Sequence, residues 1–152
     1  MFDRRAHRAA LHSMIADRQP DLAVSFNLQR ALDFYTLQSV FELFMNRMQS
    51  MVDGRRWHRI PATDRPTAIG MFENADKNPH IHASVYAPPR YVEFLRVGTA
   101  QELWSSCHPR CGQLDLDPVR SAERWAGYQI KKAYGPDALD KMVLYVPTVR
   151  RR

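Results

Sequence analysis

The sequence predicts an α+β fold in which helices flank a central antiparallel sheet. Apolar residues recur three and four apart over residues 31–52, as in an amphipathic helix. Residues 80–87 alternate polar and apolar side chains, and residues 67–74 place Ala68, Gly70 and Phe72 on the face opposite Ile69, Met71 and Glu73. These two strand-like segments are joined by a short polar turn, as in a β-hairpin. With 152 residues the chain is long enough to bury one hydrophobic core, so we expect one globular domain.

Before the hairpin, the local patterns predict a helix, a strand and the long helix. Residues 1–20 are basic, and two aspartates among them argue against a targeting segment, so we expect a basic helix or arm. Residues 22–28 alternate apolar and polar side chains and predict the first strand. The helix over 31–52 ends before an Asp-Gly pair, and an arginine-rich connection over 55–65 follows.

A Pro-Pro pair ends the hairpin, and helical spacing resumes over 90–106 with an interruption at Gly98. The remaining predicted elements are a strand over 113–119, a helix over 121–134 and a last strand over 142–146. This order of strands and helices contains the split β-α-β unit of a ferredoxin-like, or RRM-like, sheet. We expect this domain over residues 21–147 and a basic tail over 148–152.

The chain is basic, with 22 Lys and Arg against 16 Asp and Glu, a net charge of +6 and a pI of about 9.7. Clustered cations around an aromatic side chain are typical of single-stranded nucleic-acid binding, although a solvated surface has the same composition. The candidate nucleic-acid contacts are Arg55, Arg56, Trp57, Arg59, Arg90, Arg110 and Lys132. Two cysteines cannot form a disulfide framework, and no apolar stretch reaches the roughly 20 residues of a membrane span. We therefore expect a cytoplasmic protein with no membrane partner.

His80 and His82 form the most specific local motif. Strand residues two apart project from the same face, so the two imidazoles stand side by side while Ile81 points into the core. The preceding strand offers Glu73, its only carboxylate, just before the turn. Two imidazoles and a carboxylate suit Mn²⁺ and other divalent transition metals and tolerate Mg²⁺. A pair of exposed or hydrogen-bonded histidines on an amphipathic strand, with no metal, is the alternative.

Tyr128 and Lys131 are three residues apart in a predicted helix, which brings their side chains close together on its surface. A phenol beside an ammonium is a candidate nucleophile, because the cation favours the phenolate and can balance charge on a phosphate under attack. A half-buried tyrosine beside a solvated lysine would show the same spacing.

Together these motifs resemble the HUH endonuclease superfamily, which includes rolling-circle replication initiators, relaxases and single-strand transposases. The matching segments, in the family's order, are Leu22-Ala23-Val24-Ser25-Phe26-Asn27-Leu28, His80-Ile81-His82 and Tyr128-Gln129-Ile130-Lys131. The resemblance implies that Glu73, His80 and His82 hold a divalent metal ion, Mn²⁺ or Mg²⁺. It also implies that Tyr128 is the nucleophile and that Lys131 positions or neutralises the scissile phosphate.

The activity that this resemblance implies is nicking and rejoining of single-stranded DNA, at an origin or a hairpin, through a covalent 5′-phosphotyrosine. A lone nucleophilic tyrosine favours an initiator of plasmid or phage replication, and we expect the isolated protein to be a monomer. The chain has no Gly-x-x-x-x-Gly-Lys phosphate loop, so unwinding would come from a host helicase or from supercoiling.

Two other interpretations remain open. A non-catalytic RRM-like module that binds single-stranded nucleic acid would explain the fold and the charge, but it gives the histidines and the tyrosine no joint task. Cys107 and Cys111, with His58 or His12, would form a structural zinc site, although no second cysteine pair completes a tetrahedron.

Overall fold

The computed structural model describes residues 3–73, 76–131 and 136–148. Within these ranges five strands form one sheet in the order β4-β1-β3-β2-β5, with every neighbouring pair antiparallel. The strands are β1 (Leu22–Leu28), β2 (Thr67–Glu73), β3 (His80–Tyr86), β4 (Cys111–Pro118) and β5 (Met142–Tyr145). The helices are α1 (Arg4–Ala16), α2 (Phe34–Asp53), α3 (Pro89–Leu95), α4 (Gly98–Cys107) and α5 (Ala122–Gln129), with short 3-10 turns η1 (Trp57–Arg59), η2 (Ala62–Asp64) and η3 (Pro136–Lys141). The predicted α+β fold with a central antiparallel sheet is confirmed.

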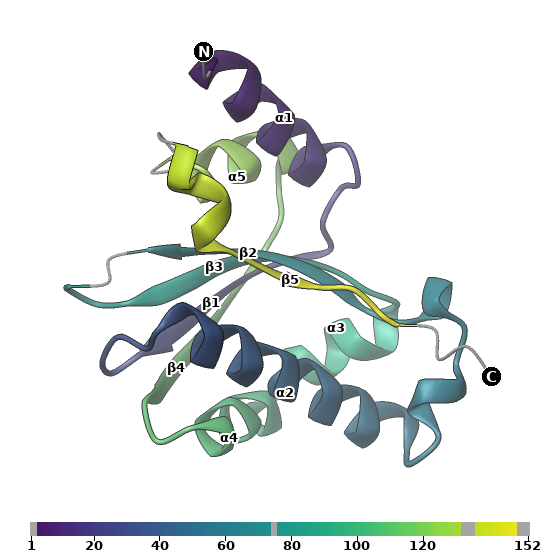
Figure 1. Ribbon diagram of the computed structural model, residues 1–152. Coiled ribbons are helices and arrows are strands. Elements are labelled where there is room, and N and C mark those ends of the chain that lie inside the picture. The colour runs from purple at the N-terminus through teal and green to yellow at the C-terminus, as the bar shows by residue number, and fades with distance from the viewer. Residues whose placement is uncertain (1–2, 74–75, 132–135, 149–152) are drawn as a thin grey trace.

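The helices cover the two faces of the sheet (Figure 1). The face covered by α2, α3 and α4 carries the larger core, where the Phe26 ring packs edge-on against Phe41, Phe44 and Trp104 at centroid distances of 5.2, 5.1 and 5.0 Å. The other face packs against α1 and α5 through a smaller apolar cluster that includes Ile69. Alternate residues of each strand belong to opposite faces, so the polar residues of β3 share the α1 and α5 face.

Two helix boundaries differ from the predicted ones for local reasons. α2 begins at Phe34, three residues later than predicted, because the Asp33 carboxylate caps the helix by accepting the N–H of Thr36 at 3.0 Å. The helix predicted over 90–106 is two helices, α3 and α4, and the second begins at Gly98, where the interruption was expected.

The third difference is at the end of α5. The helix was predicted to continue to about Tyr134, but it ends at Gln129. Lys131 lies in a tight turn, where its N–H donates to the Tyr128 carbonyl at 3.2 Å. Residues 132–135 lie outside the described part of the chain.

The basic N-terminal segment forms the helix α1, which packs against α5. Leu11 and Ile15 supply its buried face, and the His12 ring nitrogen lies 2.9 Å from the Glu123 carbonyl. None of the described helices combines the length and apolarity that a bilayer-spanning helix needs.

Candidate active site

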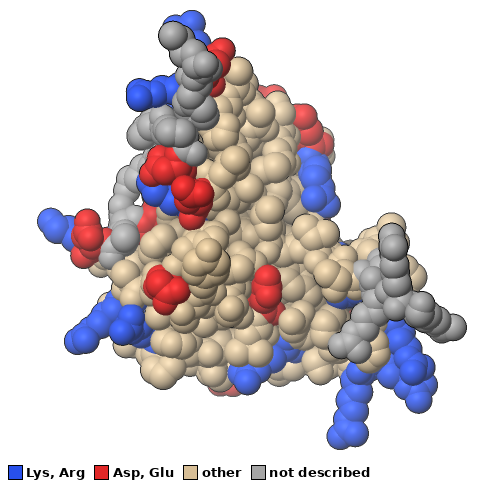
Figure 2. Space-filling model, in the orientation of Figure 1, with Lys and Arg blue, Asp and Glu red and all other residues tan. Residues whose placement is uncertain are grey.

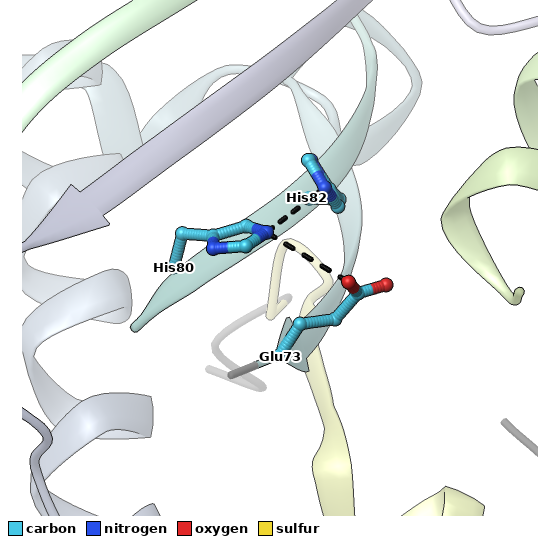
Figure 3. A group of neighbouring side chains, drawn as sticks. All are labelled: Glu73, His80 and His82. Carbon is cyan, nitrogen blue, oxygen red and sulfur yellow. Dashed lines mark hydrogen bonds and ion pairs between the residues drawn. The ribbon is translucent and has the colours of Figure 1, made fainter. Parts of the chain in front are cut away.

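Three candidate metal ligands meet where β2 and β3 pair at the hairpin (Figure 3). Glu73 and His80 are partners in the strand register, and His82 lies two residues further along β3. The Nε2 atoms of the two histidines are 2.9 Å apart, and His80 Nε2 is 3.8 Å from Oε2 of Glu73. One candidate ligand atom from each residue lies within 4.8 Å of the other two. The three side chains therefore point toward a common position.

The Nδ1 atoms of both imidazoles are engaged, so their Nε2 atoms face each other. His80 Nδ1 lies 2.7 Å from the carbonyl oxygen of Asn78, and because a carbonyl can only accept, Nδ1 donates its proton to it. His82 Nδ1 lies 2.9 Å from the hydroxyl of Ser25 on β1. Metal-binding histidines are oriented in this way, by a hydrogen bond at the ring nitrogen that does not face the ion.

The donor set fits a divalent cation. The Glu73 side chain is only 3% exposed, and the Lys131 ammonium lies 3.9 Å from its Oε2. A carboxylate buried to this degree is stabilised by positive charge beside it. Two ligand atoms about 2.1 Å from one ion and at right angles are about 3.0 Å apart. The 2.9 Å between the two Nε2 atoms matches that separation.

The cysteine alternative finds no support in the described residues, where the hairpin cluster is the only group of three candidate ligands. Cys107 and Cys111 belong to no such group. Burial raises the pKa of the Cys111 thiol to about 12, which disfavours the thiolate that binds zinc. His12, one proposed partner, instead contacts the Glu123 carbonyl.

Tyr128 and Lys131 lie beside the histidine pair. The ring centroid of Tyr128 is 5.0 Å from that of His82, and Tyr128 is 46% exposed. The Lys131 ammonium lies 3.8 Å from the centroid of the Tyr128 ring and also pairs with Glu73. Lys131 therefore bridges the tyrosine and the carboxylate, although it lies beyond the end of α5 rather than within it.

A buried glutamine that no sequence motif marks fastens α5 to the sheet next to the histidines. The Gln129 amide donates to the carbonyl oxygens of Ile69 and His82 at 2.6 and 3.0 Å. Its oxygen accepts the Ser84 hydroxyl at 2.5 Å. Because Tyr128 directly precedes Gln129, these bonds set the separation of Tyr128 from His82. The one signal in the sequence is Ser84, a polar residue on the histidine face whose buried hydroxyl needs a partner.

Gln129→Ala is expected to lower the free energy of unfolding by about 2–3 kcal/mol, because it leaves two buried carbonyls and a hydroxyl without this partner. A urea titration measures the loss. The exposed Gln29 offers a matched control, and Gln29→Ala should change the same free energy by less than about 0.5 kcal/mol. Equal losses in the two variants would contradict the anchoring role.

An open cleft of about 590 Å³ lies in front of the tyrosine and the histidines. β1 and β4 contribute four further polar residues to its lining, Ser25, Asn27, Gln113 and Asp115. The Asp115 carboxylate accepts the side-chain amides of Asn27 and Gln113 at 2.8 and 2.7 Å, so its oxygens are held in place. None of these residues was among the predicted site residues. For two of them the sequence does hold a signal, because the alternation of β1 puts Ser25 and Asn27 on the face opposite its core residues.

Most of the predicted nucleic-acid contacts lie away from this cleft. Arg55, Arg56, Trp57 and Arg59 lie in the connection that leads into the first residue of β2, whereas Glu73 is the last residue of that strand. Seven strand residues span roughly 20 Å, so this basic segment and the candidate metal ligands lie at opposite ends of β2.

The other three predicted contacts are in different surroundings. Arg90 is paired with Asp53, its Nε 2.7 Å from Oδ1, and this hydrogen bond raises the pKa of the guanidinium. Arg110 is exposed and donates to the Ala31 carbonyl at 2.6 Å. Lys132 lies outside the described residues.

Mn²⁺ is expected to stabilise the folded protein. At a free concentration one hundred times its Kd, the ion adds about 2.7 kcal/mol to the free energy of unfolding, because the unfolded chain has no preformed site. For a chain of this length the gain corresponds to a rise in Tm of about 5–10 °C over the protein in EDTA. Glu73→Gln keeps the size of the side chain but removes the anionic ligand, and should lose most of that rise. Equal rises in both proteins would place the ion elsewhere.

Four of the predicted site residues line this cleft in the described structure: His80, His82, Tyr128 and Lys131. The fifth, Glu73, is buried behind them, with its Oε2 3.8 Å from His80 Nε2 and 3.9 Å from the Lys131 ammonium. A cation site, a phenol and an ammonium are together the groups that transfer of a phosphodiester to a tyrosine requires. Comparison with known proteins identifies no relative, because no protein family model, curated protein or solved structure significantly matches this chain.

Proposed function

We propose that this chain is a metal-dependent single-stranded DNA nickase and strand transferase of the HUH type, built on a ferredoxin-like, RRM-like sheet. The observation that carries the proposal is the convergence of two imidazoles, a phenol and an ammonium at one cleft, with a buried carboxylate beside the imidazoles and the ammonium. The order β4-β1-β3-β2 of the first four strands supports the split β-α-β arrangement, to which β5 adds a strand beside β2.

Each residue has a defined part in the proposed reaction. Glu73, His80 and His82 hold a divalent ion, Mn²⁺ or Mg²⁺, which when bound supplies positive charge to a non-bridging oxygen of the scissile phosphate. Tyr128 loses its phenolic proton and attacks the phosphorus in line, and the bond to the 3′ oxygen breaks. The leaving oxygen takes up a proton as a 3′-hydroxyl, and the phosphate stays on the tyrosine as a 5′-phosphotyrosine. Lys131 balances negative charge on the phosphate under attack.

The openness of the cleft supports an unpaired substrate. In-line attack requires the phosphorus atom to lie between the tyrosine oxygen and the leaving 3′ oxygen, and an unpaired strand or hairpin can bring its backbone into that position over the sheet. Because the phosphotyrosine retains the energy of the broken bond, a later 3′-hydroxyl can reverse the reaction and rejoin a strand. Such nicking and rejoining initiates rolling-circle replication of a plasmid or phage, with unwinding by a host helicase or supercoiling.

A covalent adduct tests the proposal. The protein is incubated with a set of single-stranded and hairpin oligonucleotides labelled at the 3′ end, because the 3′ fragment is the part that stays on the tyrosine. We expect an SDS-resistant labelled band with Mn²⁺ and none with EDTA or with fully duplex DNA. Binding of the oligonucleotides without an adduct would favour the non-catalytic RRM-like module instead.

Lys131→Ala is expected to slow adduct formation roughly a hundredfold without abolishing it, because one positive charge near the phosphate is lost while the nucleophile remains. Single-turnover kinetics at saturating DNA measures the rate. Lys141→Ala is the matched control, since Lys141 is an exposed lysine paired with Asp137 on η3, and its rate should equal that of the wild type. A rate of Lys131→Ala equal to the wild type would remove Lys131 from the reaction.

A further inference from the structure

A second pocket lies at the far end of the sheet from the metal ligands. Its volume is about 330 Å³, and it is lined by residues of α2, the 55–65 connection, β5 and the segment that follows β5. Arg65 and Trp57 come from the basic connection that leads into β2. The proposed reaction gives this pocket no part.

Arg65 is the unusual residue of the pocket, because it is a cation that is only 5% exposed. Its Nε donates to the side-chain oxygen of Gln49 at 2.8 Å, and its Nη1 to the carbonyl of Thr148 at 3.3 Å. Both partners are neutral, and none of the ion pairs in the described part of the chain involves Arg65. A buried cation with neutral partners is stabilised by an anion that reaches it.

The guanidinium of Arg65 is hydrogen-bonded through two of its three nitrogens. Gln49, which is fully buried, also donates to the Tyr145 hydroxyl at 2.5 Å, and that hydroxyl donates to Asn46 at 2.7 Å. The Arg65 guanidinium carbon lies 4.9 Å from the centroid of the Trp57 ring. Over the described residues, Nη2 of Arg65 makes no hydrogen bond, so this nitrogen is the donor left for a ligand in the pocket.

The charge around the pocket favours an anion. Arg55, Arg56 and Arg59 are exposed on the same connection, and Lys and Arg side chains gather at this end of the molecule, at the lower right of Figure 2. One carboxylate, Glu42, lines the pocket, and it accepts the amide of Gln38 at 2.8 Å. The three exposed arginines of the 55–65 connection outnumber this carboxylate.

We propose that this pocket binds one nucleotide unit of a DNA strand, with a phosphate on Nη2 of Arg65 and the adjoining base against Trp57. A guanidinium is suited to a phosphate, and an indole is suited to a stacked base. That the ligand is DNA rests on the proposed function. The pocket would hold the substrate strand at a second point, roughly 20 Å from the metal ligands along β2. A free nucleotide has the same chemistry, and the experiment below separates the two.

The first measurement follows the indole N–H of Trp57 by NMR in EDTA, where no cleavage is expected. The chain has three tryptophans, and Trp57→Phe assigns the signal. We expect a twelve-nucleotide single-stranded DNA to shift this signal at concentrations of tens of micromolar, and equal concentrations of dAMP or inorganic phosphate to leave it in place. A shift of equal size with dAMP or phosphate would overturn the proposal that the pocket holds a strand.

The second measurement is the Kd of the same DNA by fluorescence anisotropy in EDTA. Trp57→Ala is expected to raise Kd about tenfold through lost stacking. Arg65→Gln should raise Kd by a similar factor and reduce the slope of log Kd against log salt by about 1. Arg96→Gln, which removes an exposed arginine at the end of α3, should leave Kd unchanged. If Arg65→Gln does not fold, the Kd of Trp57→Ala decides the test, because Trp57 is partly exposed and lies outside the buried hydrogen-bond network.

The outcomes separate this inference from the proposed function. An unchanged Kd for Trp57→Ala, in a protein that forms the adduct, would overturn the proposal that the pocket binds DNA and would leave the proposed nickase function intact. A raised Kd in a protein that forms no adduct would leave the pocket as a nucleic-acid subsite and remove the nickase. No binding of single-stranded DNA by the wild type would overturn both.

Discussion

Tyr128→Phe is expected to form no detectable adduct with single-stranded DNA, a loss of about 10⁴-fold or more, while its Kd for the DNA stays close to that of the wild type. The substitution removes one oxygen and keeps the ring. The ring supplies the contacts that the structure gives this residue, with His82 at 5.0 Å, Trp125 at 5.6 Å and the Lys131 ammonium at 3.8 Å. The position of α5 should therefore not change, and the lost rate measures the missing nucleophile alone.

Tyr35→Phe is the matched control, because Tyr35 is 84% exposed at the start of α2 and lies outside the cleft. Its adduct yield should equal that of the wild type. Mass spectrometry of the digested adduct should then find the added nucleotides on the peptide that contains Tyr128. An undiminished adduct in Tyr128→Phe, or nucleotides on another peptide, would exclude Tyr128 as the nucleophile.

The strands were predictable because their signal is local. Alternation over 22–28 corresponds to β1, and the segments 67–74 and 80–87 correspond to β2 and β3 within one residue. A hairpin pairs its own strands, so the proximity of Glu73 to His80 and His82 also follows from neighbouring sequence. This is why the candidate metal ligands could be named before the structure was known.

The rest of the site depends on contacts between distant segments. Ser25 lies 57 residues from His82 in the sequence, and only the pairing of β1 with β3 brings its hydroxyl to the ring. The position at which α5 ends also depends on distant segments, because the Gln129 side chain is hydrogen-bonded to β2 and β3 and is not exposed on a continuing helix. Arg90 was predicted as a nucleic-acid contact from its charge alone, and its pairing with Asp53 has no local signal.

His80→Ala combined with His82→Ala is expected to abolish metal-dependent adduct formation, because one carboxylate cannot hold the ion without the imidazoles. The two substitutions should lower the free energy of unfolding by unequal amounts. The His80 side chain is 12% exposed, whereas His82 is buried and its Nδ1 lies 2.9 Å from the Ser25 hydroxyl. Alanine at position 82 leaves the Ser25 hydroxyl without this partner and opens space under Tyr128, which costs about 1–3 kcal/mol.

Two single variants therefore separate lost metal from lost structure. His80→Ala removes an imidazole whose Nδ1 contacts only the hairpin carbonyl of Asn78, so its free energy of unfolding should fall by less than about 1 kcal/mol while the rise in Tm with Mn²⁺ disappears. His108→Ala, in the turn before β4, is the control and should keep both the adduct and that rise. If the double variant forms the adduct at the wild-type rate and still requires Mn²⁺, the ion is held by other residues. Full loss of the adduct in a folded His80→Ala protein, with DNA binding intact, is the result that assigns the imidazole to the reaction rather than to the hairpin.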